Sequence, residues 1–444
     1  MYKLHNDDCV IVLKGYPDNY FDSIVADPPA GISFMGKDWD HDKGGRDKWI
    51  EWMTAIASEC LRTLKPGGHA TIWSLPRTCH WTAMAWENAG FEVRDRISHV
   101  FGSGFPKSYN VAKGIEGILT NGSASWNDFH KLNGKKGENG YSSNGYVTGN
   151  AEQGNRPTAY KSHGILKLEA TTDEAKQWEG WGTALKPAME DWWLFRKPCS
   201  EKTVAANILK WGTGGLNIDA SRIEINGEVV PINKLEEWSG FGQLEKPDYK
   251  QEINQKGRWP ANFIHDGSDE VTSMFPLQAG ASGKASGPTF GKLGARGIYG
   301  SAKGENMDEP AFYGNSGSAA RFFYAAKPSK SDRDEGLDGV EKKRAGNLEF
   351  RNRESEKGQF EGTPQIAKNN HPTVKCQALM KYLITLITPP GGTVLDCFMG
   401  SGSTGVAAVK LGYPFVGIDS DKQYNYFQIA EKRIKFAAMQ ERLL

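Results

Sequence analysis

Three carboxylates in this chain stand directly after short apolar runs that predict buried strands. They are Asp27 after residues 24–26, Asp396 after residues 394–395, and Asp419 after residues 415–418. In an open α/β sheet, ligands bind beyond the carboxyl ends of the strands, where such acids can accept hydrogen bonds or protons. Pro28 and Pro29 end the first run because proline cannot donate a ladder hydrogen bond. For Asp27 alone, an ordinary Asp-Pro turn is the simpler interpretation.

A glycine-rich turn follows the second of these strands. Gly400, Gly402 and Gly405 precede a helical pattern over residues 406–411, and the strand that ends at Asp419 comes next. Glycine lets the backbone approach a ligand, the first turn of a helix offers unpaired N–H groups, and an acid at the tip of the next strand can bind ribose hydroxyls. A glycine turn, helix, strand and acid within about 25 residues form the nucleoside-binding βαβ pattern.

Together the two segments resemble the DNA amino-methyltransferases, which transfer a methyl group from S-adenosylmethionine to the exocyclic nitrogen of adenine or cytosine. Residues 27–30, Asp-Pro-Pro-Ala, are similar to the catalytic Asp-Pro-Pro-Tyr of that family, and residues 395–402 are similar to its cofactor motif. The catalytic motif comes first, as in the permuted class called beta. The resemblance is close over residues 1–115 and 370–444 and looser between them.

The resemblance implies roles for the matching residues. Asp27, Pro28, Pro29 and Ala30 would form the catalytic motif, in which the Asp27 carboxylate and the Pro28 carbonyl each accept an N–H bond from the target amine. The cofactor S-adenosylmethionine would be bound by Asp8, Asp27, His371, Thr373, Lys375, Asp396, Phe398, Gly400, Ser401, Gly402, Ser403, Thr404 and Asp419. Asp8 is equally well placed to cap a helix that contains residues 10–13.

The chain departs from the family at residue 30, where Ala30 replaces an aromatic residue. In the family that tyrosine stacks on the target base after it has been flipped out of the duplex, and base–aromatic stacking contributes about 1–3 kcal/mol per base. Ala30 therefore predicts a weakened or inactive enzyme. Two explanations stay open: an engineered, inactivated variant, which the family-like residues 31–40 favour, or a natural divergence in which Phe34 or Trp39 contacts the target base.

Periodicity predicts the elements that position these motifs. Helices are expected over residues 47–64, 80–89, 201–209 (capped by Ser200), 377–387 and from 421 to about 443, and strands over residues 70–73, 94–101 and 192–198. Strands and helices that alternate with short turns give an α/β sheet with helices on both faces. The predicted fold is a Rossmann-like methyltransferase sheet with an inserted, irregular α+β target-recognition region.

The chain is expected to divide into six parts. They are a catalytic half (1–119), a flexible loop (120–165), the end of the catalytic sheet with a helix (166–210), a target-recognition region (211–345), a connector (346–369) and a cofactor-binding half (370–444). Basic and aromatic residues in 120–165 could follow a phosphate backbone, or the segment is merely a solvated loop. A second glycine- and serine-rich tract, residues 279–318, carries further basic residues.

The composition limits which partners, metals and cellular location can be expected for this chain. The 444 residues include 54 basic and 53 acidic ones, a net charge of +1, so a DNA-binding surface has to arise from local charge asymmetry. The six cysteines show no zinc-site spacing, which predicts free thiols and no metal. The N-terminal residues lack a signal-peptide pattern, and no run of 18 apolar residues occurs. A cytoplasmic protein of the restriction-modification type is expected, with double-stranded DNA as partner and no membrane; a homodimer stays open.

The sequence thus predicts an S-adenosylmethionine-dependent DNA methyltransferase. Asp27 rather than serine at its position favours N6 of adenine, by family tendency, and N4 of cytosine is the alternative. A DNA- or cofactor-binding protein without turnover is a second alternative, which Ala30 supports. An RNA or protein methyltransferase would share the cofactor half but would not need the long insert with mixed aromatic and basic residues.

Overall fold

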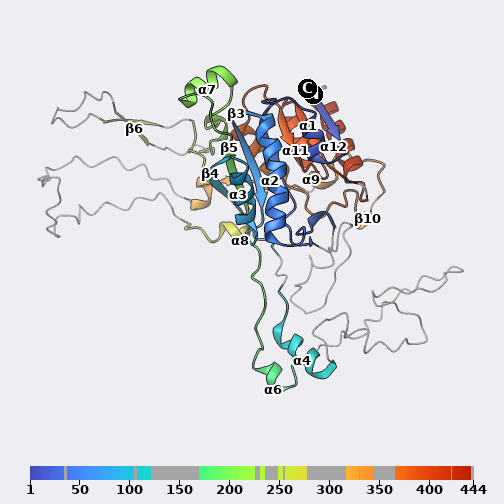
Figure 1. The fold of residues 1–444 in the computed structure, drawn as a ribbon. Coiled ribbons are helices and arrows are strands. Elements are labelled where there is room, and N and C mark those ends of the chain that lie inside the picture. Colours follow the sequence, from blue (N-terminus) through green and yellow to red (C-terminus); the bar gives the residue numbers. More distant parts are fainter. Residues whose placement is uncertain are drawn as a thin grey trace, which may run out of the picture. The chain divides into compact units, whose positions relative to one another are not determined.

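The computed structural model describes residues 1–34, 38–104, 108–121, 170–225, 231–235, 249–253, 256–277, 317–329, 331–341, 343–344, 366–421 and 423–441. The chain forms two compact units: Met1–Gly102 together with Ala188–Leu444, and Ser103–Pro187. The larger unit is built on a nine-stranded sheet with helices on both faces (Figure 1). This confirms the predicted α/β class and the Rossmann-like sheet.

The sheet has the strand order β1-β13-β12-β2-β3-β5-β4-β8-β9. The strands are β1 (Tyr2–His5), β2 (Phe21–Ala26), β3 (Leu64–Ser74), β4 (Glu92–Val100), β5 (Met189–Arg196), β8 (Phe263–His265), β9 (Tyr324–Ala325), β12 (Val394–Asp396) and β13 (Phe415–Ile418). Only β5 runs against its neighbours β3 and β4. The chain proceeds from β12 to β13 in one direction and from β2 to β3 in the other. The β12–β2 border is therefore the switch point at which such sheets bind ligands.

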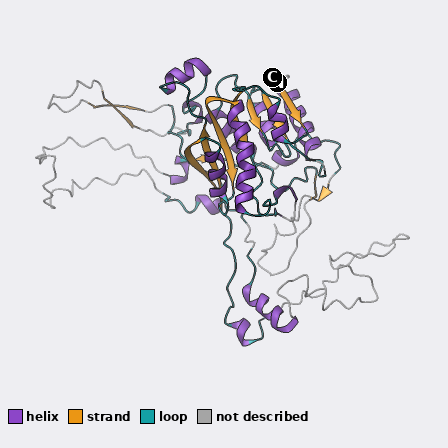
Figure 2. Cartoon of the chain, in the orientation of Figure 1, coloured by secondary structure: helices purple, strands orange, loops and turns teal. Residues whose placement is uncertain are grey.

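Two hydrophobic clusters lie on opposite faces of the sheet. Helices α1 (Cys9–Lys14), α2 (Arg46–Thr63) and α3 (Cys79–Asn88) cover one face, and α10 (Gln377–Ile387), α11 (Ser403–Lys410) and α12 (Tyr426–Glu441) cover the other (Figure 2). Side chains alternate along β2: Ile24 and Ala26 join the first cluster, and Val25 joins the second. By the same alternation Asp27 projects toward the face of α10 and α11.

Several predicted boundaries are wrong, and hydrogen bonds explain two of them. Helix α7 (Val204–Trp211) starts after Thr203, whose hydroxyl accepts a bond from the N–H of Ala206, so Ser200 is not its cap. The last helix begins at Tyr426 rather than at residue 421, because the Asp421 carboxylate accepts backbone N–H bonds from the residues ahead of the helix. Strand β1 was not anticipated; it pairs in parallel with β13.

Part of the segment 211–345 continues the main sheet. Strand β8 pairs in parallel with β4, and β9 pairs in parallel with β8. Elsewhere in this segment, residues 222–225 form only a single bridge between Ile223 and Arg258, and Ala319–Phe322 forms the 3-10 helix η5 just before β9. The remaining short elements are η2 (Asp38–Asp40), η3 (Asp219–Ser221), α8 (Asp269–Thr272), α9 (Ser331–Asp334), β6 (Pro231–Leu235), β7 (Tyr249–Ile253), β10 (Lys343–Arg344) and β11 (Ile366–Ala367).

The smaller unit contains the helices α4 (Val111–Asn121) and α6 (Asp173–Lys176). The Glu116 carboxylate of α4 accepts hydrogen bonds from the backbone N–H groups and hydroxyls of Thr171 and Thr172, which ties the segment before α6 to α4. The loop expected over residues 120–165 and the tract 279–318 lie almost wholly outside the described residues.

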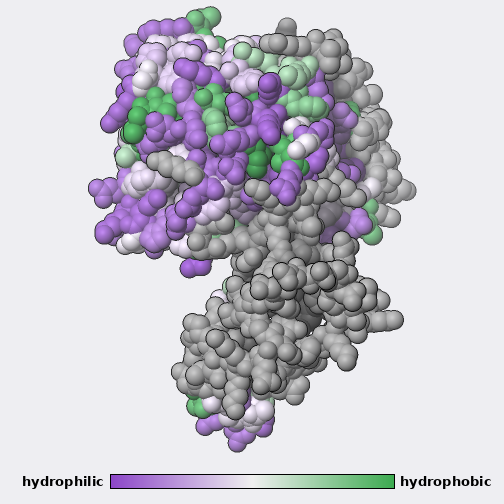
Figure 3. Space-filling view, turned by 90° about the vertical axis from the view of Figure 1, so that its right-hand side faces the viewer, coloured by the Kyte–Doolittle hydropathy of each residue, from purple (hydrophilic) through white to green (hydrophobic). Residues whose placement is uncertain are grey.

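No helix in the described ranges is long and apolar enough to cross a membrane. Among the described residues that Figure 3 colours, hydrophilic side chains prevail, with scattered hydrophobic ones between them. All six cysteines are free, and the buried Cys60 and Cys397 are neighbours, with their sulfurs 3.8 Å apart. The predicted free thiols therefore agree with the structure.

Candidate active site

Asp27 lies at the carboxyl end of β2, and the sheet fixes its main chain. All six residues of β2 are buried, and Ile24 pairs with Leu395 of β12 on one side and with Ala70 of β3 on the other. Two prolines follow, so the chain leaves the sheet immediately after Asp27. The predicted catalytic carboxylate therefore stands at the switch point between β12 and β2.

Three side chains gather at the Asp27 carboxylate. Nζ of Lys375 lies 3.4 Å from Oδ2 of Asp27 and 3.3 Å from Oε2 of Glu190. The same ammonium group stands 4.0 Å from the ring centroid of Trp73, and Nε1 of Trp73 donates a 2.9 Å hydrogen bond to Oε2 of Glu190. Lys375 is only 9% exposed, so two carboxylates and an aromatic face replace the water that its charge has lost.

These charges set the protonation of Asp27. Burial raises the pKa of Asp27 to about 6; Lys375 opposes this rise, whereas Glu190 and Asp40 add to it. Burial also raises the pKa of Glu190, but the Lys375 charge and the Trp73 hydrogen bond outweigh it, and the net pKa is lowered. Glu190 is thus ionised at neutral pH, and Asp27 becomes ionised as the pH rises through about 6.

The turn between β12 and α11 depends on two glycines in the left-handed region. Gly400 has a φ of 53° and Gly402 a φ of 82°. A Cβ on Gly400 would lie 3.0 Å from Nε2 of His371, and a Cβ on Gly402 would lie 2.9 Å from Cβ of Ala430 in α12. The turn therefore packs closely on both neighbours and presents backbone, rather than side chains, at the tip of β12.

Two carboxylates flank this turn: Asp396 is buried, and Asp419 is partly buried. Burial raises the pKa of Asp396 to about 7, although the Thr404 hydroxyl and the N–H of Phe398 donate to it. Burial likewise raises the pKa of Asp419 to about 6, against a 2.7 Å hydrogen bond from the N–H of Gly400. Neither has an ion-pair partner among the described residues. A ligand with ribose hydroxyls and positive charge, such as S-adenosylmethionine, fits this set of acceptors.

The predicted segment at residues 371–375 packs beside the glycine turn. The His371 ring contacts Tyr426 edge-on, with centroids 4.4 Å apart, and stacks on Trp39 at 6.3 Å. Burial lowers the pKa of His371 to about 3, and nearby positive charges, that of Lys375 among them, lower it as well, so the ring is neutral. The N–H of Thr373 donates to Nδ1 of this ring at 3.3 Å. His371 thus orients the segment that ends at Lys375.

The serines of the predicted cofactor motif hold the turn in place. Oγ of Ser401 accepts a 3.1 Å hydrogen bond from Asn369, and its carbonyl accepts one from the buried Arg433. The carbonyl of Ser403 accepts a 3.0 Å bond from Gln377. Asp8 is exposed and caps α1 by accepting the N–H bonds of residues 10 and 11 at 2.9 and 3.2 Å. The structure therefore shows the capping role of Asp8, and its contact with the cofactor stays a prediction.

The family model described as DNA methylase, of the N6/N4 methyltransferase type, matches residues 21–432. The chain belongs to this family. The family uses S-adenosylmethionine as its methyl donor, which confirms the predicted cofactor. Asp27 and the glycine turn after β12 both lie inside the matched range. The predicted resemblance to the DNA amino-methyltransferases is thereby confirmed.

Individual relatives match over short stretches. The chain is 38% identical over 80 residues to type II methyltransferase M.BamHI of Bacillus amyloliquefaciens, covering 17% of this chain and 18% of that protein. It is 46% identical over 65 residues to type II methyltransferase M2.DpnII of Streptococcus pneumoniae, covering 15% and 24%. The DNA adenine methyltransferase YhdJ of Escherichia coli strain K12 is 46% identical over 55 residues, covering 12% and 19%. The matched stretches thus span at most 24% of these relatives' lengths.

Among solved structures, the PvuII DNA methyltransferase described as cytosine-N4-specific aligns with 100% of this chain and 92% of its own, at a TM-score of 0.42 and 10% identity. The complex of M1.HpyAVI with SAM aligns with 98% of this chain and 99% of its own, at a TM-score of 0.36 and 17% identity.

The loop after the predicted catalytic motif is organised by Asp40. Its carboxylate accepts N–H bonds from Gly31 and Phe34 at 2.9 and 2.7 Å, and its carbonyl accepts one from Ser33 at 2.7 Å. Asp40 is 1% exposed, so these bonds fix the loop from inside. Of the proposed replacement aromatics, Trp39 is engaged with His371, and Phe34 is anchored through its backbone. Ala30 packs against the core cluster on the Val25 side of the sheet.

Three residues of the site were missed by the sequence analysis: Glu190, Trp73 and Asp40. Glu190 lies at the start of β5, and because β5 is antiparallel, its first residues lie at the carboxyl ends of the parallel strands. The sequence shows an acid at the start of an aromatic run. Whether that acid lies at the ligand-binding edge of the sheet depends on the direction of the strand. Trp73 stands at the end of β3 and was assigned only to a strand.

Replacing Gly402 by alanine is expected to weaken S-adenosylmethionine binding about 10-fold or more, because residue 402 needs a positive φ and its Cβ would collide with Ala430. Isothermal titration of the purified variants measures this. Gly391→Ala is the matched control: its φ is 71°, and a Cβ there would meet nothing within 4 Å. If both variants lost the same affinity for S-adenosylmethionine, the close packing of residue 402 on α12 would be irrelevant to binding.

Proposed function

We propose that this chain transfers the methyl group of S-adenosylmethionine to the N6 amino group of adenine in DNA. The observation that carries the proposal is the position of Asp27 at the switch point, paired with Lys375 and next to the glycine turn of β12. Membership of the DNA methylase family supports it, and so does the name of YhdJ as a DNA adenine methyltransferase.

The difficulty of the reaction lies in the nucleophile. The lone pair of an exocyclic amine is delocalised into the ring, so the amine has to be turned and held before it can attack. The Asp27 carboxylate accepts one N–H bond, and the carbonyl of Pro28 accepts the other, which localises the lone pair and aims it. When bound, S-adenosylmethionine supplies a methyl group on a positively charged sulfur that leaves as a neutral thioether.

The direct test is tritium transfer from labelled S-adenosylmethionine into mixed-sequence DNA, followed by chromatography of the nucleosides. Label in N6-methyldeoxyadenosine supports the proposal. Label in N4-methyldeoxycytidine would move the activity to the alternative base. Cofactor binding without any incorporation, for this chain and for the variant with tyrosine at residue 30, would contradict DNA methylation.

Ala30→Tyr is expected to raise the rate of transfer by about 10- to 100-fold, because a tyrosine would add a stacking face for the flipped base. Ala30→Leu is the matched control, since leucine adds bulk at the same place without an aromatic face. Initial rates of tritium incorporation measure both. A rate that rises equally with leucine would show that volume, and not stacking, is what residue 30 lacks.

We also propose a role for each part of the chain. Residues 1–119 and 370–444 supply the catalytic and cofactor-binding halves, which together contribute β1, β2, β3, β4, β12 and β13 to the sheet. Residues 166–210 complete the catalytic sheet through β5, and 346–369 connect the parts. Residues 211–345 supply the target-recognition region, and β8 and β9 join that region to the sheet.

A further inference from the structure

Trp73 contacts both of the charged side chains that stand next to Asp27. Its ring centroid lies 4.0 Å from Nζ of Lys375, and its Nε1 donates a 2.9 Å hydrogen bond to Oε2 of Glu190. The same Oε2 accepts a 3.3 Å hydrogen bond from Lys375. One indole ring therefore contacts the ammonium group through its face and the carboxylate through its N–H group.

The sheet fixes the position of the Trp73 ring. Trp73 lies near the end of β3, opposite Trp192 of β5, and it belongs to the hydrophobic cluster on the face of α10 and α11. Glu190 stands two residues before Trp192, so it is a diagonal neighbour of Trp73 on that same face. Lys375 comes from the segment just before α10. The three side chains thus meet because two strands and one helix bring them together.

Lys375 stands between two carboxylates without a short bond to either. Its Nζ lies 3.4 Å from Oδ2 of Asp27 and 3.3 Å from Oε2 of Glu190. A charge-assisted N–H···O bond is normally about 2.7–2.9 Å long. The face of Trp73 attracts the ammonium group, and the indole N–H group stabilises the Glu190 carboxylate. Both contacts favour a shared Lys375 over a closed ion pair with Glu190.

Other titratable groups near this cluster come from the adjoining strands and loops. Asp40 adds to the raised pKa of Asp27, and the charge of Asp27 in turn raises the pKa of Asp396. His99 of β4 stands opposite Glu190 in the register. Burial lowers the pKa of His99, so its ring is neutral at neutral pH. These groups therefore add negative charge, and no positive charge, around Asp27 at neutral pH.

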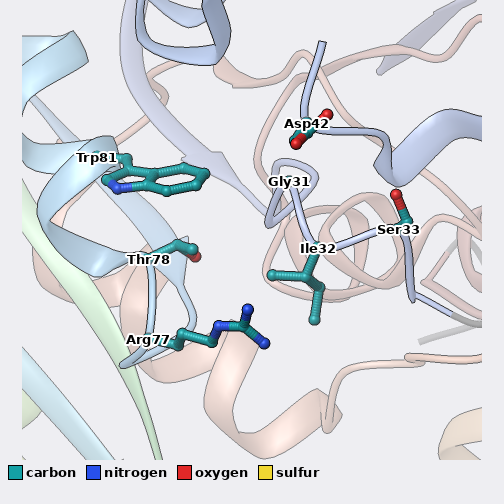
Figure 4. Close-up of a pocket in the computed structure, with 7 residues that line it drawn as sticks. All are labelled: Gly31, Ile32, Ser33, Asp42, Arg77, Thr78 and Trp81. Carbon is teal, nitrogen blue, oxygen red and sulfur yellow. The ribbon is translucent and has the colours of Figure 1, made fainter. Parts of the chain in front are cut away.

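A cavity of about 240 Å³ by the loops after β2 and β3 has charged groups of its own. Figure 4 shows the guanidinium group of Arg77 directed into it from one side and the carboxylate of Asp42 on another. Within the described ranges, its lining includes neither Trp73 nor Lys375. The positive charge that lowers the pKa of Asp27 is that of Lys375.

We propose that Trp73 is a positioning residue that keeps Lys375 shared between Asp27 and Glu190. The inference rests on the proposed function, in which Asp27 has to be ionised, and it adds the residue that distributes the positive charge. Without the indole N–H group, Glu190 would draw the ammonium group toward itself and away from Asp27. The Asp27 carboxylate would then be less stabilised and would keep its proton to a higher pH.

The test is Trp73→Phe, which keeps an aromatic face for Lys375 and removes the N–H bond to Glu190. The acid limb of the pH–activity profile, kcat against pH, is expected to move up by about one pH unit. Trp73→Leu removes the face as well, so its acid limb is expected to move further. Trp193→Phe is the matched control, because its Nε1 donates a 3.1 Å bond to the Cys79 carbonyl on the opposite face of the sheet. Its acid limb should coincide with that of the parent chain.

A second background separates the positioning role from a loss of packing. In Glu190→Gln, residue 190 carries no charge that could draw Lys375 away from Asp27. Adding Trp73→Phe to that variant is therefore expected to leave the acid limb where Glu190→Gln alone puts it. The proposal is overturned if Trp73→Phe moves the limb equally in both backgrounds, or if it does not move the limb of the parent chain upward.

The protonation of Asp27 can also be measured without methyl transfer. When an NMR-active isotope labels the carboxyl carbon of every aspartate, the titrating signal that disappears in Asp27→Asn belongs to Asp27. If the parent chain transfers no label to DNA but this signal titrates at higher pH in Trp73→Phe, the proposed function fails and the role of Trp73 stands. If the parent chain transfers label and the signal titrates identically in both proteins, the proposed function stands and Trp73 does not position Lys375.

Discussion

Asp27→Ala is expected to reduce methyl transfer by about 1000-fold or more while leaving DNA binding intact, because the amine loses the acceptor that holds its lone pair in line. Asp27 is placed for this role by β2 and not by substrate, since the strand is fully buried and two prolines end it. Asp27→Asn is the matched variant: its amide oxygen can still accept one N–H bond, so part of the activity is expected to remain.

The cofactor affinity and the single-turnover rate of the Asp27→Ala variant separate a loss of binding from a loss of chemistry. The charge of Asp27 contributes to the raised pKa of Asp396, and Lys375 pairs with Glu190 as well as with Asp27. The alanine variant therefore keeps a partner for Lys375, and its cofactor affinity is expected to change little. Single-turnover rates at saturating S-adenosylmethionine and DNA isolate the chemical step. An Asp27→Ala protein that methylates at the parent rate would refute the mechanism.

Local signals were enough to predict the elements around both motifs. Helix α10 spans residues 377–387 and β13 spans residues 415–418, as expected, because apolar periodicity marked their extent and proline or glycine bounded them. The same signals placed Asp27, Asp396 and Asp419 at strand tips. The switch point then brings these tips together, since β2 and β13 both flank β12.

The charged cluster at Asp27 could not be predicted in this way. Lys375 and Glu190 are 185 residues apart, and they meet only because β5 inserts antiparallel between β3 and β4. No local pattern encodes that direction. For Asp8 the sequence suited both a cofactor contact and a helix cap; two backbone hydrogen bonds show the cap, and the cofactor contact stays a prediction. The loop around Asp40 was unrecognised because its carboxylate bonds to backbone N–H groups, which any residue provides.

The Lys375–Glu190 pair is expected to control the pH dependence of transfer. Asp27 must be ionised to accept the N–H bond, so activity should rise as the pH increases through about 6, its pKa in the fold. Lys375→Met removes the positive charge that lowers this pKa, so the acid limb of the pH–activity profile should move to higher pH. Glu190→Gln removes a negative charge that raises it, so the limb should move to lower pH.

If the two variants of this ion pair shift the acid limb of the pH–activity profile in opposite directions, the pair acts electrostatically and not merely structurally. Loss of packing would lower the activity at every pH, whereas here Lys375→Met should lose about 10-fold or more at pH 7 and recover much of it at pH 9. Asp40 also raises the pKa of Asp27, but it is unchanged in both variants. The measurement is kcat against pH at saturating S-adenosylmethionine and DNA. Acid limbs that coincide with that of the parent chain would show that Lys375 and Glu190 do not set the charge of Asp27.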